Sequence, residues 1–211
     1  HIRLIEWGHK VSFAYIAPEG VTDEALGGLA RNMAETGQLL CSSAQGVFVD
    51  TADLEQVYAF CGRFLPILER EMRGSGQEPG IGLGCRTALK LYTEELESIY
   101  RNSRVFRGKN CSLTAYADCA LETSIQFGNA WVRPLPRTQL VRALRPYKNY
   151  LQTAGLLCAA GEREALARAL FAAGCVRVCA PENMSNTWCG APHDGEYPLR
   201  RYTKLAVLDP A

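Results

Sequence analysis

The segment best suited to chemistry is residues 36–43, with the sequence Thr-Gly-Gln-Leu-Leu-Cys-Ser-Ser. Cys41 follows an amphipathic segment and precedes the apolar run at 46–49, so we expect it on a tight turn between a helix and a strand. A thiol in that setting can meet a substrate, and neighbouring backbone N–H groups favour a thiolate and can hold an oxyanion. The alternative is a buried structural thiol, because free cysteines are often buried.

Several stretches resemble known enzymes. Residues 4–10, Leu-Ile-Glu-Trp-Gly-His-Lys, resemble the Glu-Leu-Gly-Gly-Lys segment of aldehyde dehydrogenases, and the separation of Glu6 from Cys41 is close to that of the base and nucleophile in that superfamily. IEWGHKVSFAYI and CSSAQGVFVD are similar to the LuxC-type acyl-CoA reductases, which make fatty aldehydes from acyl thioesters. YLQTAGL and PHDGEYPL also resemble that family, and the resemblance runs in order along nearly the whole chain.

The resemblance implies an α/β fold with a mainly parallel sheet flanked by helices, of the aldehyde dehydrogenase catalytic-domain type. Residues 1–211 would then be the cysteine-bearing catalytic domain, with a dinucleotide-binding domain and the family's oxyanion asparagine upstream of this chain. The intact parent would use NADPH or NADH. This chain alone is expected to bind neither cofactor, because no G-x-G-x-x-G follows a strand in it.

The resemblance also assigns roles to individual residues. Cys41 is the expected nucleophile, and Glu6 is the expected base toward a thiol or water. The expected contacts to substrate are Gln38, Ser42 and His193.

Several of these residues have a structural alternative or depart from the family pattern. Glu6 could be a solvated carboxylate at the end of a strand. His193 and Asp194 stand between a proline and a glycine, and Asp194 on such a turn could bond its own backbone. Gln38 stands three positions before the cysteine, where the family has it two before, and His9 replaces the usual glycine or proline.

The function implied is reduction of a fatty acyl-CoA, or another acyl thioester, to the aldehyde through an acyl-Cys41 intermediate. The expected partners are an acyl-CoA or acyl-protein thioester, an acyl-activating synthetase and further copies of the chain in a homo-oligomer. Two alternatives stay open. One is another aldehyde dehydrogenase branch, such as a short-chain acylating enzyme or a semialdehyde-phosphate reductase, and the other is a non-catalytic interaction domain that retains the fold.

Composition and charge narrow the classes of protein. Hydrophobic content of 47% and charged content of 21% are typical of a globular protein, and a net charge of +1 argues against a nucleic-acid binder. No apolar run approaches the length that spans a bilayer, so we expect no membrane span. No secretory signal is visible, and we expect a cytoplasmic protein with reduced thiols and no metal.

The nine cysteines and one glycine-rich segment suggest other sites only weakly. No CxxC pair occurs, so neither a zinc site nor a disulfide framework is expected. Cys175 and Cys179 fit a buried strand with both thiols on the same face. Residues 73–84 contain five glycines but lack the GKS/T ending of a phosphate cradle, which favours a flexible surface loop.

Alternating strand and helix patterns predict the elements of the parallel sheet and its covering helices. Thr22 is the expected N-cap and Gly37 the expected stop of the first helix, and Asp50 or Thr51 would cap the second. The expected strands are 2–6, 11–16, 47–49, 112–117, 123–127, 130–132, 150–158 and 175–179. The expected helices are 23–35, one carrying 54–68, 86–102, 138–144 and 162–172.

Overall fold

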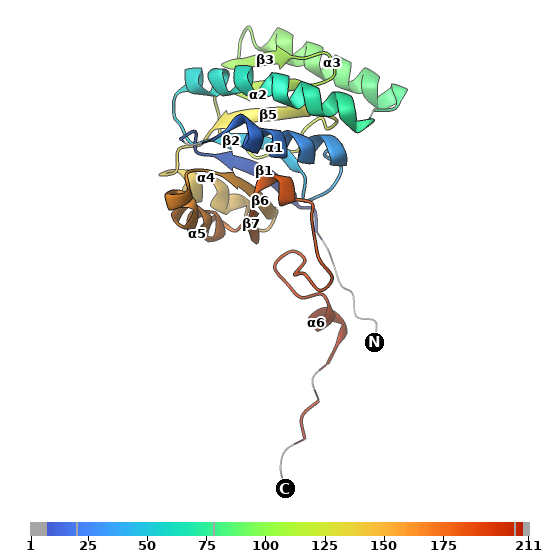
Figure 1. The fold of residues 1–211 in the computed structure, drawn as a ribbon, viewed down its shortest axis with the longest axis vertical. Coiled ribbons are helices and arrows are strands. Elements are labelled where there is room, and N and C mark those ends of the chain that lie inside the picture. The colour runs from blue at the N-terminus through green and yellow to red at the C-terminus, as the bar shows by residue number, and fades with distance from the viewer. Residues whose placement is uncertain (1–7, 20, 78, 205, 209–211) are drawn as a thin grey trace.

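The computed structural model describes residues 8–19, 21–77, 79–204 and 206–208. In this part of the chain, seven strands form one sheet in the order β3-β4-β5-β2-β1-β6-β7 (Figure 1). All neighbouring strands are parallel except β3 and β4. The strands are β1 (Val11–Ile16), β2 (Ala44–Val49), β3 (Ser103–Arg107), β4 (Ser112–Tyr116), β5 (Asn129–Pro134), β6 (Leu151–Leu157) and β7 (Arg177–Cys179). The mainly parallel sheet predicted from the sequence is confirmed.

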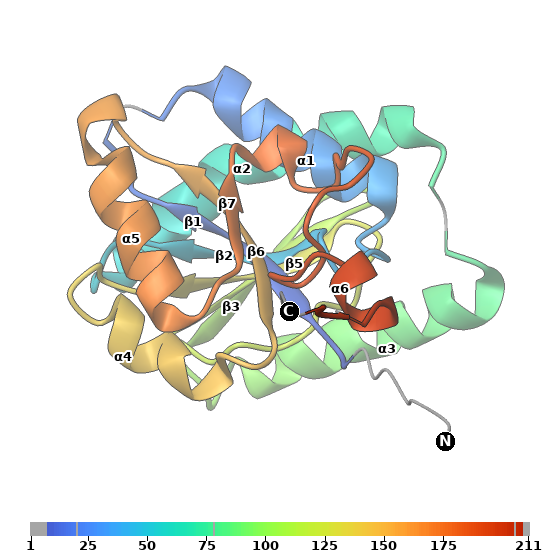
Figure 2. The ribbon, with the colours of Figure 1, turned by 90° about the horizontal axis from the view of Figure 1, so that it is seen from below.

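Helices cover both faces of this sheet (Figure 2). α1 and α2 lie on one face, α3 and α4 lie on the other, and α5 packs against α4, β6 and β7. The helices are α1 (Asp23–Thr36), α2 (Leu54–Ser75), α3 (Ile81–Glu97), α4 (Leu140–Leu144), α5 (Arg163–Ala173) and the short α6 (Leu199–Tyr202). The result is a three-layered α/β/α body.

The core consists of two apolar clusters, one on each side of the sheet. Successive residues of a strand point to opposite faces, so Phe13 and Tyr15 of β1 join one cluster while Ala14 and Ile16 join the other. The central strands are buried on both faces, which explains why they are almost continuously apolar.

Caps fix both ends of α1. The Thr22 side chain accepts a hydrogen bond from the Ala25 backbone N–H at 3.2 Å, and Gly37 ends the helix in the left-handed conformation with φ of 57°. Both caps were predicted, and both are confirmed. They matter for the site because the chain leaves α1 at Gly37 and reaches Cys41 before it enters β2.

The structure corrects the predicted boundaries of the next two helices. Asp53 caps α2, accepting from the Glu55 N–H at 2.9 Å, so the predicted cap at Asp50 or Thr51 is wrong. The Asp50 carboxylate instead accepts hydrogen bonds from Arg137. The segment expected to be a loop at 73–84 is shorter, since α2 continues to Ser75 and α3 begins at Ile81.

Two strand predictions fail. Residues 123–127 do not form a strand, because Gln126 and Phe127 have φ of 71° and 49°, which is turn conformation, and Gln126 pairs back to Asn129. β3 was missed altogether, since arginines interrupt its short apolar pattern. The strand expected at 2–6 lies outside the described residues.

The expected arrangement of Cys175 and Cys179 is also wrong. β7 begins only at Arg177, and the Cys175 N–H bonds to the Leu170 carbonyl at the end of α5. Cys175 packs in the cluster with α4 and α5, whereas Cys179 packs against the cluster with α1 and α2. The two thiols therefore lie on opposite sides of the sheet.

The parallel strands β1, β2, β6 and β7 bring their amino ends to one edge of the sheet. Ser12 pairs with Ala44 across β1 and β2, and Val11 pairs with Leu151 across β1 and β6. The segment after β7, which includes α6, extends from the layered body on this side (Figure 1). The amino edge and this C-terminal segment together form the surroundings of Cys41.

Candidate functional site

Cys41 lies on the turn that joins α1 to β2, as predicted, and it is exposed. Bonds at the base of the turn fix its shape. Ser43 Oγ donates to Thr36 Oγ1 at 2.8 Å, and the Ser43 N–H donates to the Leu40 carbonyl at 3.0 Å. These hydrogen bonds fix the backbone of the turn on its buried side, while Cys41 is exposed.

Gln38, which was predicted to contact the substrate, supports this turn from inside the protein. Its side chain is buried, with the residue only 1% exposed. Its Nε2 donates to the Ala44 carbonyl at 3.0 Å, and its Oε1 accepts from the Gly128 N–H at 3.0 Å. Both ends of the amide are thus bonded to backbone, which suits a residue that shapes the turn.

Ser12 connects the cysteine to the sheet. Its Oγ donates to the Cys41 carbonyl at 2.6 Å and accepts from the Thr153 N–H at 3.1 Å. One hydroxyl therefore ties the turn to β1 and β6. Because strands in a packed sheet are rigid, this bond fixes the backbone of the cysteine relative to the amino edge.

Cys41 opens into a cavity of about 440 Å³ between the amino edge and the C-terminal segment. Ser42 and His193, both predicted to contact substrate, line the same cavity, so the fold brings them to the cysteine. Much of the remaining wall is apolar: Phe171, Val176, Val178, Trp188, Ala191, Pro192 and Tyr197. A thiol beside apolar walls is suited to a substrate with an acyl chain.

Hydrogen bonds anchor the C-terminal segment over the cysteine turn. Asn32 Nδ2 donates to Ser185 Oγ at 2.9 Å, and Ser42 Oγ donates to the same oxygen at 3.4 Å. The Asn32 side-chain oxygen also accepts from the Ala44 N–H, so α1, β2 and Ser185 are joined at one amide. The segment that closes the cavity is thereby fixed to the turn that carries the thiol.

A second anchor lies on the other side of the cavity. His193 and Asp194 stand on a turn, as predicted, closed by paired hydrogen bonds between His193 and Glu196, with φ of 51° at Asp194. Asp194 Oδ1 accepts from Gln152 Nε2 at 2.5 Å, and its Oδ2 is 3.4 Å from His193 Nδ1. Gln152 Nε2 also lies 3.4 Å from Cys41 Sγ.

Gln152 was not predicted as a site residue, whereas Asp194 was placed with His193 on a turn but was given no role in the chemistry. Gln152 is a large polar residue in a mainly apolar strand, and this was the available signal in the sequence. Glu6, the expected base, lies outside the described residues, so its position relative to Cys41 stays a prediction.

The other cysteines divide by burial. Burial raises the pKa of the Cys61, Cys111 and Cys175 thiols to about 12, so these thiols stay protonated and unreactive. Cys85 and Cys189 are exposed like Cys41, but neither lines the cavity described above. Among the described residues no group of three or more His, Cys, Asp or Glu side chains could hold a metal ion.

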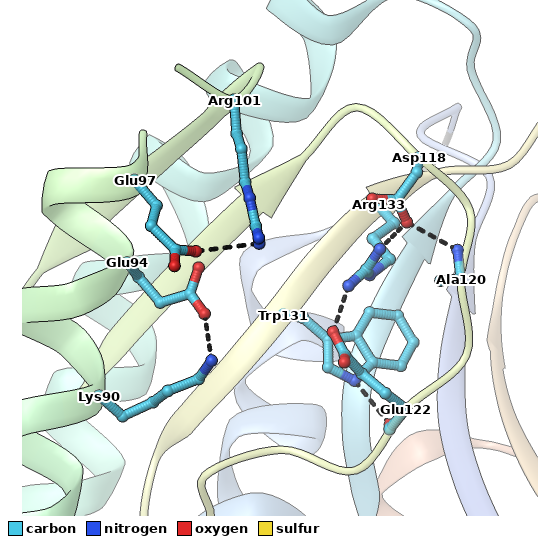
Figure 3. A network of polar contacts seen from close by, with 9 residues as sticks. All are labelled: Lys90, Glu94, Glu97, Arg101, Asp118, Ala120, Glu122, Trp131 and Arg133. Carbon is cyan, nitrogen blue, oxygen red and sulfur yellow. Dashed lines mark hydrogen bonds and ion pairs between the residues drawn. The ribbon is translucent and has the colours of Figure 1, made fainter. Parts of the chain in front are cut away.

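A second polar region lies beside α3 (Figure 3), and its cavity shares no lining residue with the cavity of Cys41. Arg133 is buried and pairs with Asp118 and Glu122, and its guanidinium stacks on the Tyr116 ring at 4.2 Å. Nearby, Lys90 Nζ lies 2.6 Å from Glu94 Oε1. The cavity between these groups measures only about 70 Å³. We call this set of residues the Arg133 cluster.

The profile of the family described as "Acyl-CoA reductase (LuxC)" matches residues 1–81 and 84–205. Comparison with curated proteins finds no match. No helix in the described part of the chain has both the length and the apolar character to cross a membrane.

Solved structures show the fold. A salicylaldehyde dehydrogenase from Pseudomonas putida G7, complexed with salicylaldehyde, is similar with a TM-score of 0.63 and 15% identity over 90% of this chain and 42% of that chain. An indole-3-acetaldehyde dehydrogenase complexed with NAD+ is similar with a TM-score of 0.57 and 16% identity, over 88% of this chain and 40% of that chain. The Δ-pyrroline-5-carboxylate dehydrogenase of Mycobacterium tuberculosis is similar with a TM-score of 0.57 and 12% identity, over 95% of this chain and 44% of that chain. The chain has the fold of an aldehyde dehydrogenase catalytic domain and spans less than half of these proteins.

Proposed function

Because this chain belongs to the LuxC acyl-CoA reductase family, we propose that it is the thiol-bearing catalytic domain of a reductase that converts a fatty acyl-CoA, or another acyl thioester, into the aldehyde. The observation that carries the proposal is the exposed Cys41 thiol at the mouth of a largely apolar cavity of about 440 Å³. An acyl chain can bury itself against the apolar wall while its carbonyl carbon meets the sulfur.

The chemistry assigned to Cys41 is thioester exchange. The Cys41 thiolate forms a bond to the acyl carbonyl carbon, and the electron pair of the C=O double bond moves onto the oxygen. When the carbonyl re-forms, the bond from carbon to the CoA sulfur breaks and CoA leaves as a thiolate. A thioester replaces a thioester, so the step is nearly balanced in energy, and the protein must mainly stabilise the charged oxygen. Ser42 and His193 line the space in which the substrate would lie.

The reduction also needs a nicotinamide cofactor, NADPH or NADH. In the part of the chain that the structure describes, no strand leads into a G-x-G-x-x-G turn that could hold the pyrophosphate of such a cofactor. We therefore assign cofactor binding to another domain of a longer protein, consistent with the chain spanning less than half of the aldehyde dehydrogenases it resembles. An acyl-activating synthetase partner and a homo-oligomer remain predictions.

The test compares two cysteine variants in the protein that contains both domains. With a long-chain acyl-CoA and NADPH or NADH, Cys41→Ala should lower aldehyde formation by at least about 10³-fold, because no other described group replaces the nucleophile. Cys85→Ala is the matched control, since Cys85 is exposed but does not line the cavity, and it should keep the wild-type rate. Aldehyde formation that persists in Cys41→Ala would refute the covalent mechanism. A wild-type protein that reduces no acyl thioester would refute the activity.

A further inference from the structure

The side chain of Gln152 approaches the reacting sulfur. Gln152 lies near the start of β6, is 6% exposed, and points its Nε2 at two acceptors, Cys41 Sγ at 3.4 Å and Asp194 Oδ1 at 2.5 Å. We propose that Gln152 is a catalytic residue whose amide N–H stabilises the Cys41 thiolate and then the charged oxygen formed by its attack on the acyl group. The proposal rests on the function proposed above and adds a second residue to its chemistry.

Asp194 sets the orientation of this amide. A primary amide has two N–H bonds, so one can donate to the carboxylate while the other faces the sulfur. In the reversed orientation the amide oxygen would face both a carboxylate and a thiolate, which is unfavourable. Asp194 thus acts as a positioning residue through Gln152. Its turn is itself fixed by the paired bonds of His193 with Glu196 and by the ion pair of Glu196 with Arg201.

The amide oxygen supports the same conclusion. Gln152 Oε1 is buried and has no hydrogen-bond partner in the described part of the chain. A buried acceptor without a partner destabilises a protein, and an apolar side chain of similar shape would fill the position without that penalty. The amide is therefore explained by the two acceptors of its nitrogen, Cys41 and Asp194, and not by its contribution to packing.

The position of the donor also suits the next step of the reaction. As Cys41 Sγ bonds to the carbonyl carbon, the negative charge moves from sulfur to an oxygen two bonds away. An N–H that already lies beside the sulfur can follow the charge with a small side-chain movement. Donors that strengthen their bond as charge develops lower the barrier, typically by a factor of about 10² to 10³ for each donor. Collapse of the charged intermediate then expels CoA as a thiolate.

The first experiment measures the thiol without any substrate. In the full-length protein, alkylation of Cys41 by iodoacetamide is followed against pH by peptide mapping. Gln152→Leu should move the midpoint of the rate curve to higher pH by about one unit, the size expected for a lost hydrogen bond to a charged group. The titratable and charged groups that line the cavity with Cys41 are Arg177, His193, Asp194 and Tyr197, and all stay in place in this variant.

Controls separate this role from a structural one. Gln152→Met retains the length of the side chain without a donor and should reproduce the shift if Gln152→Leu does not fold. Gln45→Leu is the matched control, because Gln45 is equally buried at the start of β2 but bonds to Ser124 and the Gln38 carbonyl instead of the sulfur. It should lower the thermal stability and leave the alkylation midpoint unchanged.

The second experiment measures acyl transfer in a single turnover from a long-chain acyl-CoA. Gln152→Leu should slow transfer to Cys41 by about 10²-fold, with little change in the acyl-CoA concentration that gives half of the maximal rate. Asp194→Asn should slow it less, and adding Asp194→Asn to Gln152→Leu should cause no further loss, because Asp194 acts through Gln152. Wild-type rates and an unchanged alkylation midpoint in both Gln152→Leu and Gln152→Met would overturn the inference. A wild-type protein that is not acylated would overturn the proposed function instead.

Discussion

In both the Cys41 site and the Arg133 cluster polar side chains line a cavity, but the two regions differ in what those side chains bond to. In the Arg133 cluster, charged groups bond to one another: Arg133 with Asp118 and Glu122, and Lys90 with Glu94. At the Cys41 site the thiol is exposed, and its neighbours fix the backbone and the amide beside it. The cavities measure about 70 Å³ and about 440 Å³ respectively.

The contrast extends to proton affinities. Burial lowers the pKa of Arg133 to about 10 and raises the pKa of Tyr116 and Glu122 above their ordinary values. Shifted pKa values often mark active sites, but ion-pair networks shift them as well. In the Arg133 cluster, the groups with shifted pKa values surround a cavity of only about 70 Å³, which is too small for a substrate. In this fold a reactive group beside open apolar space is the better indicator of chemistry.

After Cys41→Ala, the largest effect is expected for Glu6, which would then belong to the reactive Cys41 site and not to a structural region. In the full-length protein, Glu6→Gln should slow turnover by about 10²-fold or more if the carboxylate acts as a base, because an amide cannot accept the proton. The amide has nearly the same shape, so circular dichroism and the melting temperature should match wild type. An unchanged rate would leave Glu6 with a structural role only.

A smaller effect is expected from breaking the Arg133 cluster. Lys90→Met removes the ion-pair partner of Glu94, which is only 2% exposed, so a buried carboxylate loses its counter-charge. The free energy of unfolding should fall by about 2 kcal/mol. The loss is moderate because the lysine side chain is half exposed and solvent screens the pair. The double variant Lys90→Met/Glu94→Leu should recover most of this loss. Urea unfolding provides both values.

Acyl transfer to Cys41 should stay at the wild-type rate in both of these variants, since the cluster does not line its cavity. A tenfold slower transfer in a folded Lys90→Met protein would mean that the two regions are coupled, and the structural role assigned to the cluster would then be wrong.

The smallest effect concerns the buried thiols, the structural counterparts of Cys41. Their pKa of about 12 in the folded protein exceeds the ordinary value of 9.0. Above pH 9 the unfolded chain loses these protons first, so stability should fall as pH rises from 9 to 12, by about 1 kcal/mol per thiol per pH unit. Urea unfolding at pH 9 and 10 should show a smaller pH difference for Cys175→Ala than for wild type. Equal pH differences in stability for the two proteins would contradict the raised pKa assigned to Cys175.

Local signals in the sequence predicted much of this fold. Thr22 and Gly37 bound α1 because capping depends on neighbouring residues, and the position of Cys41 on the following turn could be predicted from the same pattern. Non-local contacts explain the failures. Residues 123–127 have an alternating pattern, yet Ser124 bonds to Gln45 and the Gln126 carbonyl accepts from Asn129, which fixes a turn.

The site shows the same division. Cys41, Ser42 and His193 were predicted, and the fold places all three at one cavity. Gln152 and Asp194 are far apart in the sequence, and only the pairing of β1 with β6 and the return of the C-terminal segment bring them together. A glutamine inside an apolar strand is a weak signal until its partner across the cavity is known.

The proposed mechanism requires that Cys41 takes up the acyl group. The most direct measurement incubates the full-length protein with a long-chain acyl-CoA, without NADPH or NADH, and locates the added acyl mass by peptide mapping. We expect one acyl group per chain, on the Cys41 peptide, with release of one CoA. Acyl groups on Cys85 or Cys189 with an unmodified Cys41 would contradict it.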